Sequence, residues 1–313
     1  MDVEERIGPS TLISGEGGAR AMASTITQVK EAGFKTIELC PAQFHAVDPL
    51  SAPSFLEHLF GEAERRRLRT MLRPFRVVTV HGSSYWVTKL RCGLTKEALW
   101  QPYLELMRFA RDIGAHIVSF HPFQRSAGAA ISNDDMFAYN LEFGKRAVER
   151  AEEWNLAVAF ENMPSNGGWS LLEAVNEVVA EVDSERFRLL FDVGHAVLQR
   201  GLSSGNLTQP VLHLIEDCID QTRQFHFHGV QRIEGDMDGG LRDHRPVDAN
   251  NVLDYFQIMS LLKNNKFDGP IVLEIYFATA SEKRAAFRTN LRACMGAKNE
   301  LVKYWMEARS LAS

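Results

Sequence analysis

The feature that most constrains the fold of this chain is a repeated alternation between short apolar runs and longer amphipathic stretches. The apolar runs are rich in β-branched residues, and they lie at 5–13, 35–40, 76–81, 115–121, 156–161, 187–192, 222–228 and 270–275. They are continuous rather than strictly alternating, which is typical of parallel strands covered on both faces. The sequence therefore predicts eight parallel strands.

The stretches between these runs have the spacing of amphipathic helices. In 95–113 the apolar residues recur at helical intervals, at Leu99, Tyr103, Leu106, Ala110 and Ile113. Further helices are expected at 134–154, 208–219, 250–265 and 282–308. Strands that alternate with helices predict an α/β fold, and eight such units favour a single (β/α)8 TIM barrel over residues 1–313.

The alternative architecture is a doubly wound open sheet, which usually carries a glycine fingerprint after its first strand. The first turn here reads Gly15-Glu16-Gly17-Gly18, which is not G-x-G-x-x-G, and the chain has no Walker A motif. A nucleotide cofactor is therefore not expected.

Composition narrows the cellular setting and the class of partner. The four cysteines include no C-x-x-C pair, which fits a reducing cytoplasm rather than a disulfide framework. No apolar run approaches the roughly 18 residues that span a bilayer, and the acidic N-terminus lacks the features of a signal peptide. The net charge of −5 disfavours a broad nucleic-acid surface. We expect a small-molecule substrate and no membrane association, and a homo-oligomer is possible.

Histidines and carboxylates stand at or just after the ends of six consecutive predicted strands. This strand-end series consists of His81, His121, Glu161, Asp192 with His195, His226 with His228, and Glu274. Successive members lie 31 (Glu161 to Asp192) to 48 (His226 to Glu274) residues apart, about one βα unit. In a barrel these ends converge on one site.

Each member of the series also has an ordinary structural explanation. A single histidine at a strand end is more often a hydrogen-bonded structural residue, and a lone carboxylate can cap the following helix. Six in a row are harder to explain in this way, because clustered buried carboxylates and imidazoles need a cation to neutralise them. Histidines mixed with carboxylates suit Zn²⁺, Mn²⁺ or iron, whereas Mg²⁺ and Ca²⁺ prefer oxygen ligands. A divalent metal site is therefore predicted.

The series resembles the endonuclease IV and xylose isomerase-like TIM-barrel superfamily, which includes AP endonuclease family 2, over nearly the whole chain. The matching pieces are Val80-His81, Phe120-His121-Pro122, Phe160-Glu161-Asn162, Asp192-Val193-Gly194-His195, His226-Phe227-His228, Asp243-His244-Arg245-Pro246 and Leu273-Glu274. The resemblance implies two possible chemistries. Sugar isomerases and epimerases hold one metal, and their ligands would fall here on Glu161, Asp192, His226 and Glu274.

The endonuclease IV-like phosphoester hydrolases bind three zinc ions. The resemblance places their further ligands on His81, His121, His195 and His244. An aspartate two residues before His244 would complete the pattern, but that position is Arg242, which is instead expected to contact substrate. Asp243 would serve only if the loop shifts by one residue.

The additional histidines favour hydrolysis of a small phosphorylated or nucleotide-like substrate at a multinuclear zinc site, with manganese as the alternative metal. Glu161 would bridge two ions that lower the pKa of a bound water, and Tyr85 and Trp86 would line the substrate groove. His195 would be a metal ligand in this chemistry.

The alternative is a single-metal sugar or sugar-phosphate isomerase or epimerase, or a related keto-sugar lyase or dehydratase. It would work through an enediolate, with Glu161 and Glu274 as the acid/base pair, and His195 would contact substrate. The resemblance selects His226 as the ligand and leaves His228 for substrate, although the two rings share one side of a strand and the reverse assignment remains open. A third hypothesis is a barrel without catalytic activity that binds a partner.

Overall fold

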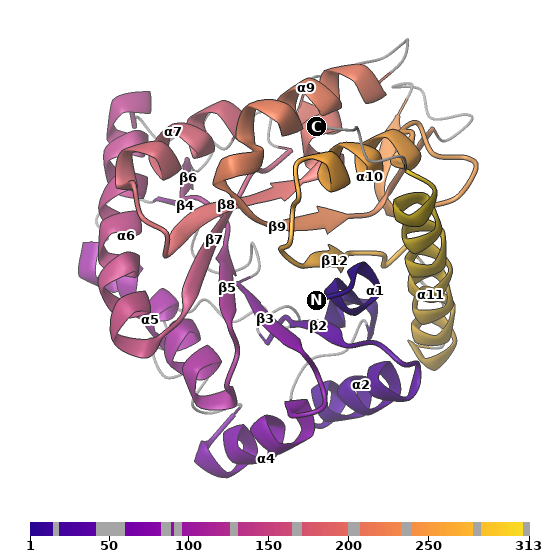
Figure 1. The fold of residues 1–313 in the computed structure, drawn as a ribbon. Coiled ribbons are helices and arrows are strands. Elements are labelled where there is room, and N and C mark those ends of the chain that lie inside the picture. The colour runs from indigo at the N-terminus through magenta and orange to yellow at the C-terminus, as the bar shows by residue number, and fades with distance from the viewer. Residues whose placement is uncertain are drawn as a thin grey trace.

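The computed structural model describes residues 1–14, 19–41, 60–82, 89–90, 96–125, 131–164, 171–199, 207–232, 240–277 and 283–308. Its centre is a parallel eight-stranded sheet curved into a barrel (Figure 1). In sheet order the strands are β1 (Ile7–Pro9), β12 (Ile271–Leu273), β9 (Thr222–Phe227), β8 (Phe187–Asp192), β7 (Ala157–Glu161), β5 (Ile117–Phe120), β3 (Val77–Gly82) and β2 (Thr36–Leu39). A parallel bridge between Ser10 and Glu38 joins the two ends of this order. The predicted TIM barrel is confirmed.

Helices surround the barrel and connect its strands (Figure 1). They are α2 (Ala19–Glu31), α4 (Glu62–Leu72), α5 (Lys96–Ile113), α6 (Asn133–Trp154), α7 (Leu172–Val182), α9 (Thr208–Cys218), α10 (Tyr255–Asn264) and α11 (Lys283–Glu307), with the short α1 (Val3–Arg6) and α8 (Val193–Gln199). Two 3-10 turns, Thr11–Ser14 and Ile219–Gln221, lie beside them. No helix in the described ranges has the length and apolar character needed to cross a bilayer.

Two small sheets lie outside the barrel. An antiparallel pair joins β10 (Gly229–Arg232) to β11 (Leu241–Arg245), so that the chain leaves β9 and turns back over the end of the barrel. A short parallel pair joins β4 (Lys89–Leu90) to β6 (Gln124–Arg125). The first of these pairs carries His244 and Arg242 to the C-terminal end of the barrel.

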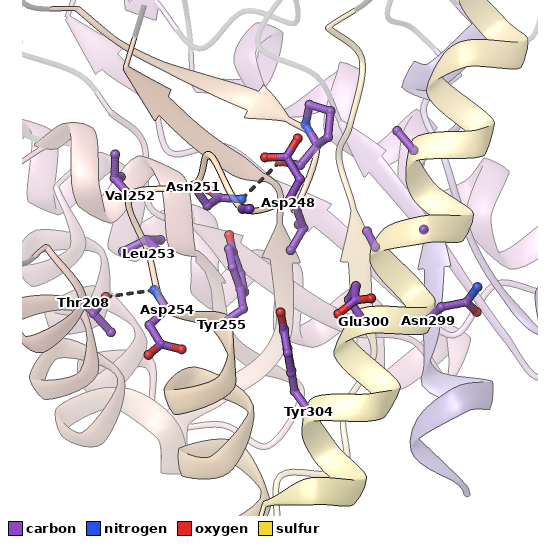
Figure 2. Close-up of a pocket in the computed structure, with 16 residues that line it drawn as sticks. Thr208, Asp248, Asn251, Val252, Leu253, Asp254, Tyr255, Asn299, Glu300 and Tyr304 are labelled. Carbon is purple, nitrogen blue, oxygen red and sulfur yellow. Dashed lines mark hydrogen bonds between the residues drawn. The ribbon is translucent and has the colours of Figure 1, made fainter.

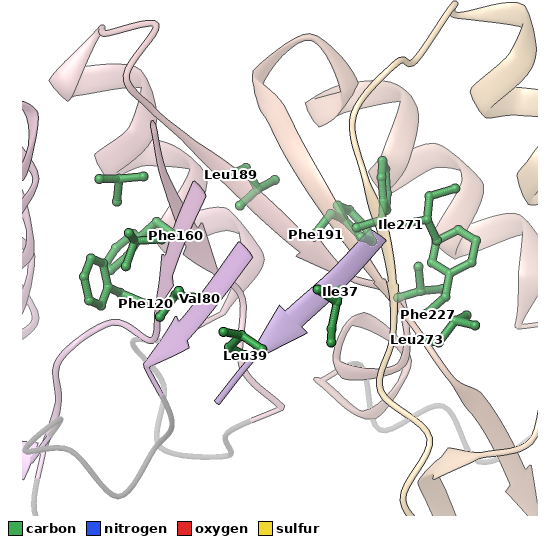
Figure 3. Packing of buried hydrophobic residues seen from close by; sticks show 14 of the residues in the cluster. Ile37, Leu39, Val80, Phe120, Phe160, Leu189, Phe191, Phe227, Ile271 and Leu273 are labelled. Carbon is green, nitrogen blue, oxygen red and sulfur yellow. The ribbon is translucent and has the colours of Figure 1, made fainter. Parts of the chain in front are cut away.

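The barrel strands alternate between two different environments. Their outward side chains are large and apolar and pack under the helices, as Ile37, Val80 and Phe160 show (Figure 3). Neighbouring positions in each strand face the opposite way, and there the small separate cluster of Ile117, Ala159 and Leu190 lies apart from the main core. Residues two positions further along the strands are Glu161 and Asp192, so the interior becomes polar towards the C-terminal end.

The predicted strands after the first agree with the structure to within two residues at each end, but the range 5–13 contains a strand only at Ile7–Pro9, between α1 and a 3-10 turn. One helix also begins later than expected. Helix α10 begins at Tyr255 and not near residue 250. The carboxylate of Asp254 is its N-cap and accepts hydrogen bonds from the backbone N–H groups of Phe256 and Gln257. The residues before it pair with β10 instead, through a bridge between Gln231 and Asn251.

Candidate active site

Four members of the strand-end series meet at the C-terminal end of the barrel. His226 Nδ1 lies 3.5 Å from Glu161 Oε1, 3.8 Å from Asp192 Oδ2 and 3.5 Å from Glu274 Oε2. All four side chains are buried, and they come from or directly follow β7, β8, β9 and β12. We call Glu161, Asp192, His226 and Glu274 the quartet. One nitrogen and three carboxylates at these separations can hold a single divalent ion.

A second group shares Glu161 with the quartet. The Glu161 Oε2 atom lies 3.0 Å from His121 Nε2 and 3.5 Å from His81 Nε2, and the two histidine nitrogens are 3.1 Å apart. Tetrahedral zinc with bonds of about 2.0–2.1 Å separates its ligand atoms by roughly 3.3–3.4 Å, so this triangle has the right dimensions for a zinc ion. The two oxygens of Glu161 therefore face two different groups of potential ligands.

His195, His228 and His244 form a third group, in which the three rings have different partners. His195 Nδ1 lies 3.0 Å from the carbonyl oxygen of Asn162, and His244 Nδ1 lies 2.9 Å from the carbonyl oxygen of Glu274. Each Nδ1 therefore donates to a carbonyl, which leaves Nε2 of both rings available to an ion or a substrate.

His228 differs because both of its nitrogens already have partners. Its Nδ1 accepts the backbone N–H of His244 at 2.9 Å, so its proton is on Nε2, which lies 3.1 Å from both carboxylate oxygens of Asp192. This arrangement makes His228 a support for Asp192. His226, in contrast, presents Nδ1 to three carboxylates, and this geometry fits the assignment of His226 as the ligand.

Asn162 holds the ends of β7 and β8 together beneath these groups. Its Oδ1 accepts the backbone N–H of Asp192 at 2.8 Å, and its Nδ2 donates to the backbone oxygen of Asp192 at 3.1 Å. The backbone N–H of His195 in turn donates to Asp192 Oδ1 at 2.6 Å. Asn162, which follows Glu161 in one of the matching pieces, thus positions the backbone of Asp192.

The buried charges of this site shift several pKa values. Burial would raise the pKa of Glu161, but the imidazoles of His121, His226 and His81 outweigh it and hold this pKa well below its ordinary value. Burial likewise opposes protonation of His195, yet Asp192 and Glu161 raise its pKa to about 10. Burial lowers the pKa of His244, and the neighbouring His228 lowers it further. Binding an ion at His195 would therefore release a proton.

The donor set fits a bound divalent ion. Among the described residues, several buried atoms have no hydrogen-bond partner: His81 Nδ1, His121 Nδ1, both Glu161 oxygens, His226 Nδ1 and Glu274 Oε1. Buried polar atoms in folded proteins are normally paired, and an anionic cluster of this kind is costly without a cation. The quartet supplies oxygen and nitrogen ligands of the kind that manganese and zinc accept.

The other predicted site residues are placed less centrally. Arg242 lies on β11 and is exposed, while Asp243 Oδ2 lies 3.7 Å from His244 Nε2. Tyr85 and Trp86 fall outside the described residues. Their predicted substrate contacts stay predictions.

Glu38, a fully buried carboxylate in β2, is not among the residues predicted from the sequence. Its Oε2 lies 3.2 Å from His226 Nε2, on the side of the ring opposite the quartet. The signal was present in the sequence, because a glutamate between the buried Ile37 and Leu39 must face the other side of the strand, into the barrel.

A separate pocket of about 900 Å³ lies outside the barrel, between the segment 246–255 and α11 (Figure 2). Asp248, Asp254 and Glu300 give it an acidic character, and Tyr304 forms part of its wall. None of the strand-end residues lines this pocket. The nearest link is Tyr255, which lines the pocket and donates its hydroxyl hydrogen to the backbone oxygen of His228.

The family described as xylose isomerase-like TIM barrel matches residues 26–294. An uncharacterized protein of Methanocaldococcus jannaschii is 21% identical over 258 residues, which are 81% of this chain and 79% of that protein.

Two solved structures show the same fold at low sequence identity. L-ribulose 3-epimerase is 13% identical with a TM-score of 0.70, covering 99% of this chain and 96% of its own. The IolI protein with a bound zinc atom is 13% identical with a TM-score of 0.68, covering 98% of this chain and 100% of its own. These likenesses agree with the barrel described above.

Proposed function

Because this chain belongs to the xylose isomerase-like TIM barrel family, we propose that it is a divalent-metal-dependent epimerase or isomerase of a ketose or ketose phosphate. The additional histidines of the sequence favoured phosphoester hydrolysis first and this chemistry second. The similarity to a sugar 3-epimerase over nearly the whole chain supports the reverse order. The zinc in the similar IolI protein supports a metal in the site.

The observation that carries the proposal is the pair of buried carboxylates in the quartet. Glu161 and Glu274 each approach His226 Nδ1 to 3.5 Å, from different strands. An epimerase must remove a proton from a carbon beside the carbonyl group and return one on the opposite face. Two carboxylates on either side of a bound sugar can divide these tasks, one as the base and the other as the acid.

The quartet would hold the ion, and a divalent ion bound there would supply a positive charge that polarises the carbonyl and the neighbouring hydroxyl of the sugar. Asp192 keeps its position through His228 and the backbone N–H of His195. His195 would present Nε2 to a hydroxyl group of the substrate. Glu161 and Glu274 would move the proton.

Proton exchange tests the proposal whichever sugar is the substrate. The protein would be incubated in D₂O with Mn²⁺ and a panel of ketopentoses, ketohexoses and their phosphates, and the carbon-bound protons would be followed by NMR. We expect deuterium to enter beside the carbonyl of at least one sugar. Glu161→Gln and Glu274→Gln should each lower the exchange rate by about 10²–10⁴-fold, the usual contribution of a general base or acid.

Phosphoester hydrolysis remains the second candidate because of one specific observation. The two oxygens of Glu161 face separate groups of ligands, the quartet and the His81–His121 pair, as a carboxylate bridging two zinc ions would. Elemental analysis and a chromogenic phosphodiester separate the two functions. Two or three zinc ions per chain, hydrolysis that His121→Ala abolishes, and no deuterium exchange into any sugar would overturn the epimerase proposal.

A further inference from the structure

Glu38 lies inside the barrel, below the quartet, and its partners come from strands on both sides of the interior. Its Oε2 accepts a hydrogen bond from Gln224 Nε2 at 2.8 Å and one from Thr79 Oγ1 at 3.3 Å, and it lies 3.2 Å from His226 Nε2. Thr79 is on the neighbouring β3, but Gln224 and His226 are on β9, separated from β2 in the sheet by β12 and β1. The carboxylate therefore reaches across the barrel to the one histidine of the quartet.

The two nitrogens of His226 face opposite kinds of neighbour. Nδ1 faces the carboxylates of Glu161, Asp192 and Glu274, whereas Nε2 faces Glu38. An ionised carboxylate can only accept hydrogen bonds. A proton on Nε2 therefore donates to Glu38 and leaves the lone pair on Nδ1, where a metal ion would need it.

Gln224 provides the competing arrangement. Its Nε2 lies 3.1 Å from His226 Nε2 as well as 2.8 Å from Glu38. If Glu38 did not accept the proton of His226, the amide of Gln224 would donate to His226 Nε2 instead. The ring proton would then be on Nδ1 and would block the metal-binding nitrogen.

A direct metal-binding role for Glu38 fits the geometry less well. Ligand atoms of Glu38, His81 and His226 do lie within 4.8 Å of one another. The Glu38 oxygen lies on the Nε2 side of His226, however, so it cannot join the ion that Nδ1 would bind. A neutral imidazole carries a lone pair on only one nitrogen, so a second ion at Nε2 would compete with the first.

We infer that Glu38 is a positioning residue, which fixes the tautomer and orientation of His226 through Nε2 so that Nδ1 is free to bind the metal ion; this rests on the metal site of the proposed function. Supporting partners of metal-bound histidines typically change metal affinity by about 10–100-fold. A carboxylate holds the proton on Nε2 more firmly than a neutral acceptor, so both its charge and its oxygen contribute.

Two variants separate these contributions. Glu38→Gln keeps the shape and one acceptor oxygen, and its new amide N–H group can donate to Gln224 Oε1, which has no partner among the described residues. Glu38→Leu removes the acceptor. Ser119→Ala is the matched control, because Ser119 is equally buried on β5 and its hydroxyl has no hydrogen-bond partner within the described ranges.

Calorimetric titration with Mn²⁺ and ¹⁵N NMR of histidine-labelled protein form the test. We expect about 10-fold weaker Mn²⁺ binding for Glu38→Gln and about 100-fold for Glu38→Leu, with unchanged stoichiometry, and no change for Ser119→Ala. With diamagnetic Zn²⁺ bound, the proton of His226 should be on Nε2 in the wild type, whereas in Glu38→Leu at the same Zn²⁺ concentration a fraction of the protein should carry it on Nδ1. The second measurement reports on the tautomer independently of any activity.

The contrary outcomes are distinguishable. Mn²⁺ affinities within twofold of the wild type in both Glu38 variants would overturn the inference and leave the metal site intact. Loss of one bound ion in Glu38→Gln, with the remaining ions bound as before, would also overturn it, because Glu38 would then be a ligand. A wild-type protein that binds no Mn²⁺ or Zn²⁺ would overturn the inference and the proposed function together.

Discussion

Gly194, which lies between Asp192 and His195, must be a glycine for a steric reason. A Cβ atom added there would lie 2.0 Å from His228 Cε1 and 2.7 Å from its Nδ1. No real side chain tolerates such contacts, so the ring of His228 can support Asp192 only because residue 194 has no side chain. The glycine of this motif is thus explained by packing.

We predict that Gly194→Ala displaces His228 and disturbs Asp192 with it. Overpacking of this kind typically costs about 1–3 kcal/mol, so urea unfolding should show that loss, and calorimetry should show weaker Mn²⁺ binding. Gly296→Ala is the control, since nothing lies within 4 Å of a Cβ at this helical position in α11. Alanine in a helix interior is favoured over glycine by about 1 kcal/mol. Equal behaviour of the two variants would contradict the steric explanation.

At the scale of single elements, Lys263 of α10 forms hydrogen bonds to the C-terminal end of α11. Lys263 Nζ donates to the carbonyl oxygens of Trp305 at 2.8 Å and of Ala308 at 2.7 Å. The last carbonyls of a helix lack partners within it and carry a partial negative charge, so an ammonium group is well suited to this position.

Lys263→Met should therefore loosen the end of α11. Hydrogen bonds to charged groups contribute about 1.5–3 kcal/mol, and we expect a loss in that range in urea unfolding, with faster amide exchange near residues 304–308. Lys303→Met removes a lysine from α11 itself, where its only ion pair among the described residues spans 3.9 Å to Glu300. Losing that exposed ion pair should lower the free energy of unfolding by less than about 1 kcal/mol. Fast exchange in the control alone would contradict the assigned role of Lys263.

The strands show what the sequence could and could not predict. The strands carry an apolar outer side, and six of the eight predicted strands have a histidine or carboxylate at or just after their ends, so strand positions and strand-end residues such as Glu161 could be found from local pattern. Glu38 was not predicted as a site residue because it precedes the last residue of its strand. Only the alternation of Thr36-Ile37-Glu38-Leu39 indicates that its side chain faces the barrel interior. Its partner, 188 residues away at His226, depends on the closure of the whole barrel.

The tautomers of the histidines and the hydrogen bonds that support them could not be predicted from the sequence. His226 and His228 are two residues apart with identical side chains, and their roles differ because the backbone N–H of His244 occupies Nδ1 of His228. The non-glycine His244 has a φ of 53°, an unusual backbone conformation that directs this group. A sequence pattern carries no information on such a turn. The pieces of the multinuclear pattern were predictable, but which chemistry they serve was not.

At the scale of the whole molecule, the site and the barrel depend on each other. The residues of the quartet lie in or directly after β12, β9, β8 and β7, which are four consecutive strands of the sheet. Three buried carboxylates repel one another in a folded chain without an ion, whereas unfolding separates them. An ion that binds only the folded protein must therefore stabilise the barrel as a unit.

We predict that Mn²⁺ raises the melting temperature and that the quartet accounts for the increase. At an ion concentration 100 times its Kd, the stabilisation is about 2.7 kcal/mol. At roughly 2 °C per kcal/mol for a large domain, this corresponds to about 5 °C above the chelator-treated protein in scanning calorimetry.

Glu274→Gln removes a ligand together with one of the repelling charges, so its melting temperature should fall below the wild type in Mn²⁺ but match or exceed it in chelator. Glu177→Gln, at an exposed position on α7, should follow the wild type in both conditions. A Glu274→Gln protein destabilised equally with and without the ion would show that Glu274 supports the fold directly and not through metal binding.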